Sequence, residues 1–562
     1  SLTPPTTPAY TTEDISASYT VVSYSDNVTM PTASDYTGYT AFIFYMTMAG
    51  FLLCIIGGFF FNGFHPKLYQ EVFLFLFFFC LFQLLGDSLP VLIYQNFGKL
   101  VWPFLFLCIV LGIICAASIA SSTAHELETN ENSLKKSVKA QTRKEIVTFF
   151  SESLSGKTTT FDAGKPLKLS EVEHYRDVVW QLWKEANDGF KEEKLIALDT
   201  LSSASTGYWE LPDSLEPNAV MPYYWGMKGT DEAGNELPLF LYLHGSGPKE
   251  REWSTGLNIC RNFDDAPSVY FIPQIPNEGE YYRWWQKAKQ FAWEKLLRQS
   301  LLLGKIDPNR VYVFGISEGG YGSQRLASFY ADYWAAAGPM AGGEPLKNAP
   351  AENCSNIAFS LRTGFYRNTL TGYVREAFDS LAHQHPGYFT HKIELIPGMG
   401  HSIDYRPTTP WLKQYVRNPY PKYVSWENFE MDGLYRKGFY NLYVKERSDE
   451  EGKSRTYYEM SISGNHISLK VDDVVYEATE KDQRWGIEMK FAKKYAQAHK
   501  GKVVIYLCDE LVDLTEKVTL TVNGKKVFEG KVKADLKNMV NSCAVFFDPQ
   551  RLYPAAIEVE LK

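Results

Sequence analysis

The feature that most constrains the fold is an apolar segment that ends abruptly in a Gly-x-Ser-x-Gly motif. Residues 311–316 are mostly β-branched or aromatic, Ser317 follows them, and residues 321–330 are compatible with a helix. This order predicts a buried strand, a sharp turn and a helix. A serine at such a turn adopts a strained backbone conformation that lifts its hydroxyl clear of the sheet. We therefore predict that Ser317 is a nucleophile; the alternative is a plain turn between a strand and a helix.

Apolar segments on both sides of this motif alternate with helical patterns. The apolar segments are 238–243, 268–272, 334–340, 357–361 and 392–396, and residues 291–303 have the spacing of an amphipathic helix. Continuous apolar strands that alternate with helices are typical of a mostly parallel sheet covered on both faces. The sequence therefore predicts an α/β domain over residues 206–425.

A serine nucleophile needs a base within hydrogen-bond reach. His401 is favoured among the ten histidines because it ends a glycine-rich loop, Gly-Met-Gly-His, directly after the last apolar strand. A histidine at this place is suited to take the proton of Ser317. The alternative is an exposed loop histidine without a chemical role.

The second requirement is an oxyanion hole, in which backbone N–H groups face the developing negative charge. The loop 244–247 (His-Gly-Ser-Gly) follows a predicted strand and offers the N–H groups of Gly245 and Ser246. The N–H of Glu318, next to Ser317, is the other candidate donor. A glycine-rich turn without a ligand is the alternative.

Three motifs stand in the order typical of the α/β-hydrolase family. They are His-Gly-Ser-Gly at 244–247, Asp-Pro-Asn-Arg-Val-Tyr-Val-Phe-Gly-Ile-Ser-Glu-Gly-Gly at 307–320, and Gly-Met-Gly-His at 398–401. Within that family the chain resembles secreted esterases related to polyhydroxybutyrate depolymerases and carbohydrate esterases. Residues 206–562 as a whole resemble hydrolases of gut Bacteroidetes. The resemblance implies hydrolysis of carboxylic esters through an acyl-serine intermediate, on a small-molecule or polysaccharide ester.

The acid that would complete a catalytic triad departs from the family pattern. The family places it just after the strand 357–361, and residues 362–368 of this sequence contain no carboxylate. Two substitutes are Glu344, which follows the preceding strand, and Asp404, three residues past His401. Glu344 is slightly favoured for its place at a strand end and its longer side chain. A Ser–His dyad with a reduced rate is the further alternative.

Residues 39–122 differ from the rest of the chain in their apolar character. The segments 41–61, 72–94 and 100–121 are each about long enough to cross a bilayer. We therefore predict two or three transmembrane helices that bring residues 41–121 into contact with membrane lipid, with buried helices of a soluble core as the alternative. The predicted location is the cell envelope, membrane-anchored or secreted, on a side of the membrane that the charge pattern leaves open.

The third apolar segment has a second interpretation. Lys99 precedes an apolar core, and the small residues 115–122 follow it, as in a secretory signal peptide. Such a segment inside a chain is expected if residues 1–98 had been joined to a secreted protein.

The remaining regions are predicted from composition and short patterns. Residues 1–38 contain no Lys or Arg and are rich in Thr, Ser, Tyr and Pro, which predicts a disordered polar tail. Residues 123–205 are predicted to be a linker with an amphipathic helix within 170–196. Residues 426–562 contain short strands and an Asn-Gly hairpin turn at 523–524, which predicts a small antiparallel β domain.

Charge and cysteine content exclude some classes of function. The net charge is −8, so the chain lacks the basic surface of a nucleic-acid-binding protein. No His/Cys cluster has metal-ligand spacing, and we predict neither a metal site nor a cofactor. Cys508 and Cys543 are predicted either to pair or to remain two buried thiols.

Two other functions compete with an esterase on these patterns. One is a serine peptidase of the prolyl-oligopeptidase kind, on the same fold. The other is a non-catalytic, membrane-anchored binding protein on an inactive hydrolase scaffold, which the missing acid keeps open. Aromatic residues at 281–285, Tyr405 and Trp411 predict either a platform for a sugar ring or aromatic acyl group, or ordinary packing on the sheet.

Overall fold

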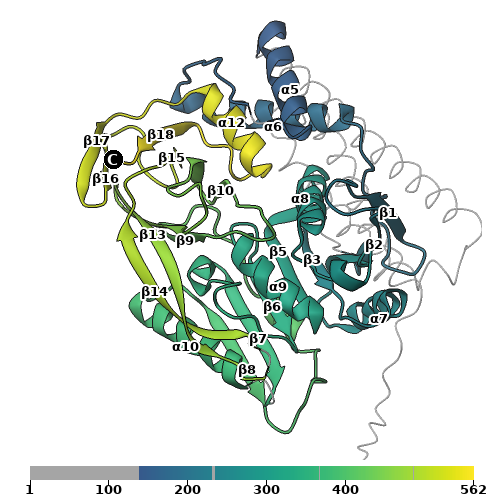
Figure 1. Cartoon of the computed structure of the whole chain (residues 1–562). Helices are drawn as coiled ribbons and strands as arrows, with labels where there is room; N and C mark the ends of the chain where they lie inside the picture. The colour runs from purple at the N-terminus through teal and green to yellow at the C-terminus, as the bar shows by residue number, and fades with distance from the viewer. Residues whose placement is uncertain (1–137, 158, 231–233, 366–367, 485) are drawn as a thin grey trace, which may run out of the picture. The chain divides into compact units, whose positions relative to one another are not determined.

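A computed structural model describes residues 138–562, except 158, 231–233, 366–367 and 485 (Figure 1). The predicted polar tail, the predicted membrane spans and the start of the predicted linker lie outside the described residues. None of the helices that the structure describes is long and apolar enough to cross a membrane.

The largest sheet has eight strands in the order β1-β2-β4-β3-β5-β6-β7-β8. The strands are β1 (Thr206–Glu210), β2 (Val220–Lys228), β3 (Leu237–Leu243), β4 (Ser268–Pro273), β5 (Ile306–Ile316), β6 (Ala336–Met340), β7 (Ala358–Gly364) and β8 (His391–Ile396). β1 pairs with β2, and β2 with β4, in the antiparallel sense, whereas the pairs from β4 through β8 are parallel. The predicted mostly parallel sheet is confirmed.

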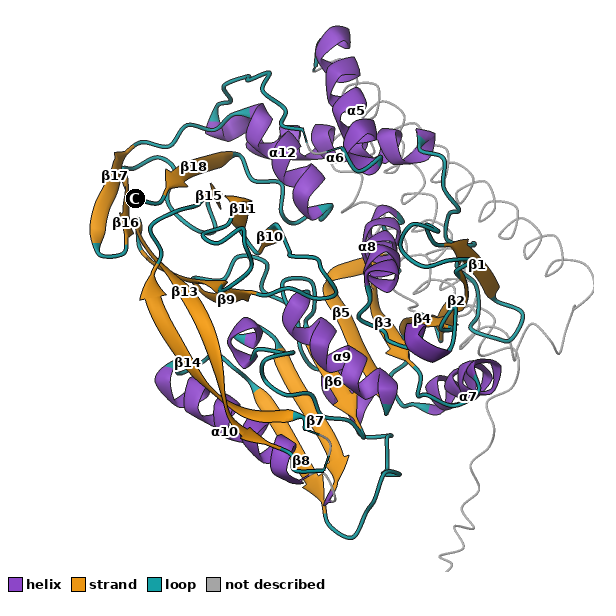
Figure 2. Cartoon of the chain, viewed as in Figure 1, coloured by secondary structure: helices purple, strands orange, loops and turns teal. Residues whose placement is uncertain are grey.

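Helices cover both faces of this sheet (Figure 2). They are α7 (Lys249–Asn262), α8 (Lys287–Leu302), α9 (Glu318–Phe329), α10 (Asn368–Gln384) and α11 (Thr408–Leu412). Along β3, Leu239 and Leu241 belong to one buried cluster with α8 and α9, while Phe240 and Tyr242 belong to another with α7 and α11. Because successive side chains of a strand point to opposite faces, an entirely apolar strand contributes to both cores.

The C-terminal region forms two further sheets. One has the order β17-β16-β13-β12-β9 with β14 paired to β13, and the other has the order β10-β11-β15-β18. The bounds are β9 (Tyr423–Asn428), β10 (Gly438–Phe439), β11 (Leu442–Glu446), β12 (Arg455–Ser463), β13 (His466–Lys481), β14 (Glu488–Gln497), β15 (Lys502–Leu507), β16 (Val518–Val522), β17 (Lys525–Gly530) and β18 (Ala555–Glu560). The pairs are antiparallel except β13 with β16, which run parallel. Residues of these sheets share one hydrophobic cluster with the large sheet.

Two helices before the large sheet pack on a helix near the C-terminus. α5 (Ala140–Leu154) and α6 (Val172–Gly189) form a separate buried cluster with α12 (Leu536–Phe546). The amphipathic helix predicted within 170–196 is confirmed as α6, whose Val179 and Trp183 are buried in this cluster. Its apolar residues recur at helical spacing, and α12 covers them. The sequence did not predict α12.

Cys508 and Cys543, predicted either to pair or to remain two buried thiols, belong to different buried clusters. Cys508 and Cys543 are both free, buried thiols. The alternative without a disulfide therefore holds.

Candidate active site

Ser317 lies at the sharp turn between β5 and α9. Its backbone has φ 58° and ψ −113°, outside the regions that L-residues ordinarily occupy. A Cβ at Gly319 would lie 1.8 Å from the carbonyl oxygen of Leu243, and one at Gly320 would lie 2.2 Å from that of Met340. Only glycine fits at these two positions. The Ser317 N–H also donates to the Met340 carbonyl oxygen at 3.0 Å, which fixes the turn.

His401 is brought to this turn by the loop after β8. Oγ of Ser317 and Nε2 of His401 lie 2.9 Å apart, at hydrogen-bond distance. In the tautomer that carries its proton on Nδ1, Nε2 accepts from the Ser317 hydroxyl. The loop is held against β7, since a Cβ at Gly364 would lie 1.9 Å from the carbonyl oxygen of Gly400. The structure therefore brings the predicted nucleophile and base together in the geometry that proton transfer needs.

The loop after β3 begins with His244, whose side chain is fully buried. Nε2 of His244 accepts from the N–H of Ile275 at 3.1 Å, so Nδ1 carries the proton and donates to the carbonyl oxygen of Gly245 at 2.8 Å. Burial lowers the pKa of His244 to about 4, against the smaller opposing effect of the Gly245 bond. His244 is thus a neutral group that shapes the loop.

Two aromatic side chains form hydrogen bonds with carbonyl oxygens of the same loop. The hydroxyl of Tyr282 lies 2.7 Å from the Gly245 carbonyl oxygen and 2.8 Å from that of Gly247, and Trp284 Nε1–H donates to the carbonyl oxygen of His244. A Cβ at Gly245 would lie 3.3 Å from Cβ of Ser317, so the loop passes directly beside the nucleophile. The oxyanion donors at Gly245, Ser246 and Glu318 remain predictions, now with two of the three placed next to Ser317.

The side chain of Glu318 is half-buried and weakly paired. Its Oε2 lies 3.6 Å from Nη1 of Arg283. Burial raises the pKa of Glu318, the Arg283 charge opposes this, and the neighbouring Glu344 adds to it.

Glu344 follows β6 and is buried. Its carboxylate lies 2.9 Å from Nε of Arg325 and accepts from Nδ2 of Asn348, also at 2.9 Å. The Arg325 guanidinium in turn lies 3.7 Å from the ring centroid of Trp285. These contacts compensate the Glu344 charge within the protein.

Asp404 is exposed and forms a two-point contact with Arg406. Nε and Nη2 of Arg406 donate to its two carboxylate oxygens at 2.8 and 3.0 Å. The side-chain and backbone bonds from Arg406 lower the pKa of Asp404 to about 2. An arginine thus engages each of the two candidate acids, Asp404 and Glu344, and the choice of the triad acid stays a prediction.

The aromatic residues at 281–285, Tyr405 and Trp411 were predicted either to contact a substrate or to pack on the sheet. Their exposure in the structure differs. Tyr282 and Trp284 are buried and hydrogen-bond to the loop 244–247. Trp285, Tyr405 and Trp411 are half-buried and keep part of their rings accessible. Tyr281 is half-buried as well, so these four residues remain candidates for contact with a substrate.

Within the residues that the structure describes, no group of three or more His, Cys, Asp or Glu side chains could hold a metal ion.

The sheet order, with its antiparallel first strands, places the serine turn after β5 and the histidine loop after β8. This arrangement decides the fold. The chain has an α/β-hydrolase fold. The predicted fold class is confirmed for this part of the chain.

The chain has only distant similarity to known proteins. No family model and no curated protein matches the chain. Among solved structures, it is similar to a thermostable esterase (19% identity, TM-score 0.28, 38% of this chain and 60% of that one). It is also similar to a ferulic acid esterase (14%, TM-score 0.29, 37% and 97%) and to a carboxylesterase from Mesorhizobium loti (19%, TM-score 0.26, 36% and 96%). The chain thus covers less than two thirds of the thermostable esterase.

Proposed function

We propose that the protein is a serine hydrolase that cleaves carboxylic esters through an acyl-serine intermediate. The observation that carries the proposal is the 2.9 Å bond from Ser317 Oγ to His401 Nε2, made by a serine in a strained elbow. The strained backbone of Ser317 costs free energy, and the surrounding structure must maintain it. Strain of this kind clusters at functional sites, so a strained serine beside an imidazole favours a chemical role over a structural one.

The chemistry follows from this contact. As Ser317 Oγ attacks the ester carbonyl carbon, Nε2 of His401 takes the hydroxyl proton. The carbonyl oxygen becomes an oxyanion, which accepts from the N–H groups proposed at Gly245, Ser246 and Glu318. The C–O bond to the alcohol then breaks, and the His401 imidazolium returns the proton to the leaving oxygen. Water repeats these steps on the acyl-serine and releases the carboxylic acid.

The proposed substrates are esters of carbohydrates or aromatic acids. The half-buried rings of Trp285, Tyr405 and Trp411 support this choice, because a sugar face or an aryl group stacks on such rings. A panel of substrates tests it: an acetylated sugar, methyl ferulate, p-nitrophenyl acetate and a peptide p-nitroanilide. We expect turnover of the esters and none of the anilide. Faster cleavage of the anilide would show a peptidase, and no turnover of any substrate would favour an inactive scaffold.

We also propose that residues 41–121 attach the protein to the membrane of the cell envelope, or that their last segment directs its secretion. The basis is the apolar composition of these residues. A chain that begins at residue 125 is expected to be soluble without detergent and to keep its ester hydrolysis. If that chain aggregates and restoring residues 41–121 prevents the aggregation, the apolar segments belong instead to the folded core.

A further inference from the structure

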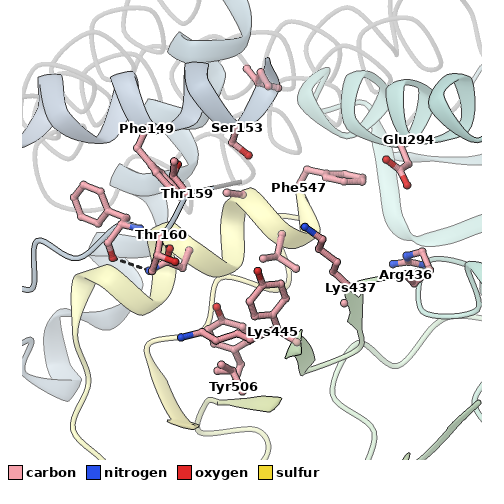
Figure 3. Close-up of a pocket in the computed structure, with 18 of the residues that line it drawn as sticks. Phe149, Ser153, Thr159, Thr160, Glu294, Arg436, Lys437, Lys445, Tyr506 and Phe547 are labelled. Carbon is pink, nitrogen blue, oxygen red and sulfur yellow. Dashed lines mark hydrogen bonds between the residues drawn. The ribbon is translucent and has the colours of Figure 1, made fainter. Parts of the chain in front are cut away.

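A cavity of about 880 Å³ lies between α5, α8, α12 and the four-stranded C-terminal sheet (Figure 3). Neither Ser317, nor His401, nor the loop 244–247 lines it. Its volume is in the range of sites that bind small molecules. It is therefore a candidate binding site separate from the proposed ester-cleaving site.

The walls of the cavity are fixed by packing and hydrogen bonds. The rings of Tyr333 and Phe547 stack with centroids 5.5 Å apart, and the Tyr333 hydroxyl donates to the carbonyl oxygen of Phe546 at 2.8 Å. Asn541 of α12 exchanges two hydrogen bonds of 2.9 Å with the backbone of Phe161. A wall held in this way is pre-formed, which lowers the entropic cost of binding a ligand.

Two exposed lysines give the lining a place for an anion. Basic side chains outnumber acidic ones in the lining, but ion pairs already hold five of the basic ones: Lys157, Lys295, Arg298, Arg436 and Lys445. The acidic Asp535 accepts from the N–H of Lys537 as the cap of α12. The side chains of Lys533 and Lys537 are exposed. Over the described part of the chain, no ion pair holds either of these two lysines, so both are available to a carboxylate.

Ring and apolar surfaces face the same space as these charges. Phe291 and Leu434 both line the cavity and are 39% and 43% exposed. Figure 3 shows Phe547, Lys445 and Thr160 around the same space. Exposed apolar side chains inside a hollow are characteristic of ligand sites, because covering them removes apolar surface from water.

We propose that this cavity binds an acidic oligosaccharide, with carboxylates at Lys533 and Lys537 and sugar rings against Phe291 and Phe547. Hydroxyl groups of such a ligand find partners in polar lining side chains such as Thr160. A fatty acid does not match the lining, because charged groups also line the cavity and an alkyl chain would desolvate them. This site is additional to the proposed ester hydrolysis and does not depend on it.

The carboxylate of Glu294 also lines the cavity. Its Oε1 accepts from the Tyr330 hydroxyl at 3.2 Å, and Arg436 belongs to the same lining.

The test uses the full-length chain with Ser317→Ala, which removes ester cleavage from the assay. Calorimetry compares tetragalacturonate with its methyl ester, which keeps the sugar chain and lacks the charges. We expect the acid to bind at least about tenfold tighter than the ester, which corresponds to about 1.4 kcal/mol. The affinity for the acid should fall as salt is raised.

Substitutions locate the site. Lys533→Ala with Lys537→Ala should weaken binding of the acid by about tenfold, and Phe291→Ala by a similar factor. Lys531→Ala is the matched control, since Lys531 is exposed in the same segment and does not line the cavity; it should leave binding unchanged. In the Ser317 background all these variants should hydrolyse esters normally.

Three results would overturn the proposal. The first is no binding of tetragalacturonate at millimolar concentration, and the second is equal binding of the acid and its methyl ester. The third is an equal loss of affinity in Lys531→Ala and in the double lysine variant. Each result leaves the proposed ester hydrolysis untouched, because that activity is measured separately in the chain with Ser317.

Discussion

The candidate active site and the junction between the large sheet and the C-terminal region use charged groups in opposite ways. At the active site, His401 and Asp404 are exposed, whereas Glu344, the other candidate acid, is buried and pairs with Arg325. At the junction, Asp332, Asp548 and Arg551 are completely buried. Water can reach and rearrange His401 and Asp404, whereas the groups at the junction have only protein partners.

The junction is a continuous network of ion pairs. Asp332, in the turn after α9, accepts from Arg436 at 2.9 Å and also pairs with Arg551. Arg551 Nε donates to Asp548 at 2.8 Å, and Arg417 donates to the same carboxylate at 2.7 Å. Burial alone would raise the pKa of Asp332, but the guanidinium groups outweigh it and hold this pKa below its usual value.

This difference between the active site and the junction predicts whether a substitution changes the rate of the reaction or the stability of the fold. Exposed, sparsely bonded groups contribute little to stability, so their removal should change chemistry and leave the fold intact. Buried, fully paired groups leave an uncompensated charge when one partner is lost, so their removal should change stability and leave the chemistry of the folded fraction intact. The predictions below test this division, beginning with the largest effect.

Ser317→Ala should lower kcat for ester hydrolysis by about 10⁶. No other group replaces the attacking oxygen, and the alanine fits the elbow as the serine does. The measurement is hydrolysis of p-nitrophenyl acetate, with the midpoint of denaturant unfolding as the control for folding. Retention of near-native turnover would remove Ser317 from the mechanism, and a large loss of stability would break the division stated above.

One of the two candidate acids should matter for turnover and the other should not. Replacing the true acid, by Glu344→Gln or Asp404→Asn, should lower kcat by about 10⁴, because the imidazolium loses its stabilising carboxylate. The other substitution should change kcat by less than about tenfold. We favour Glu344 for its position after β6. Rates within tenfold of the unmodified protein in both variants would indicate a Ser–His dyad.

Asp332→Asn should lower the free energy of unfolding by about 3–5 kcal/mol, since it removes the carboxylate that pairs with the buried Arg436 and leaves Arg551 only Asp548. The matched control is Asp379→Asn, whose exposed carboxylate lies 2.9 Å from His391. That substitution should cost less than about 1 kcal/mol. Denaturant unfolding measures both, and kcat per folded molecule should stay unchanged. Equal, small effects at the two sites would contradict the contrast between junction and surface.

His244 sharpens the comparison, because it belongs to the active-site loop and is buried like the junction. The unfolded chain protonates this imidazole near pH 6.5, whereas the folded chain resists protonation until about pH 4. Its contribution to stability is therefore complete above pH 6.5 and is lost as the pH falls to about 4, by about 3 kcal/mol. Denaturant unfolding over this range should show the decrease, and His244→Asn should show a shallower one. The same slope in both proteins would contradict a buried, neutral His244.

Local sequence patterns predicted the elements that carry the site. The apolar run of β5, the glycines around Ser317 and the loop that ends in His401 are each contained in a few neighbouring residues. A strand that is apolar throughout indicates burial on both faces of the sheet. A glycine indicates a place where two backbone segments approach closely. The structure accordingly places Ser317 and His401 within one hydrogen bond.

Contacts between distant residues could not be predicted in the same way. Arg325 and Glu344, or Asp332 and Arg551, carry nothing in their local sequence that pairs them. The helix α12 was missed because its segment lies among strand patterns, and its burial depends on α6, more than 300 residues earlier in the chain. Long-range packing of this kind overrides local propensity.

The most direct test of the central claim is covalent labelling by a fluorophosphonate probe, followed by identification of the modified peptide. Such a probe reacts with a serine that an adjacent base activates. The account predicts a single labelled site, at Ser317, that disappears in both Ser317→Ala and His401→Ala while the proteins remain folded. Labelling of another residue, or no labelling of the folded protein, would contradict the claim that Ser317 and His401 form a working nucleophile and base.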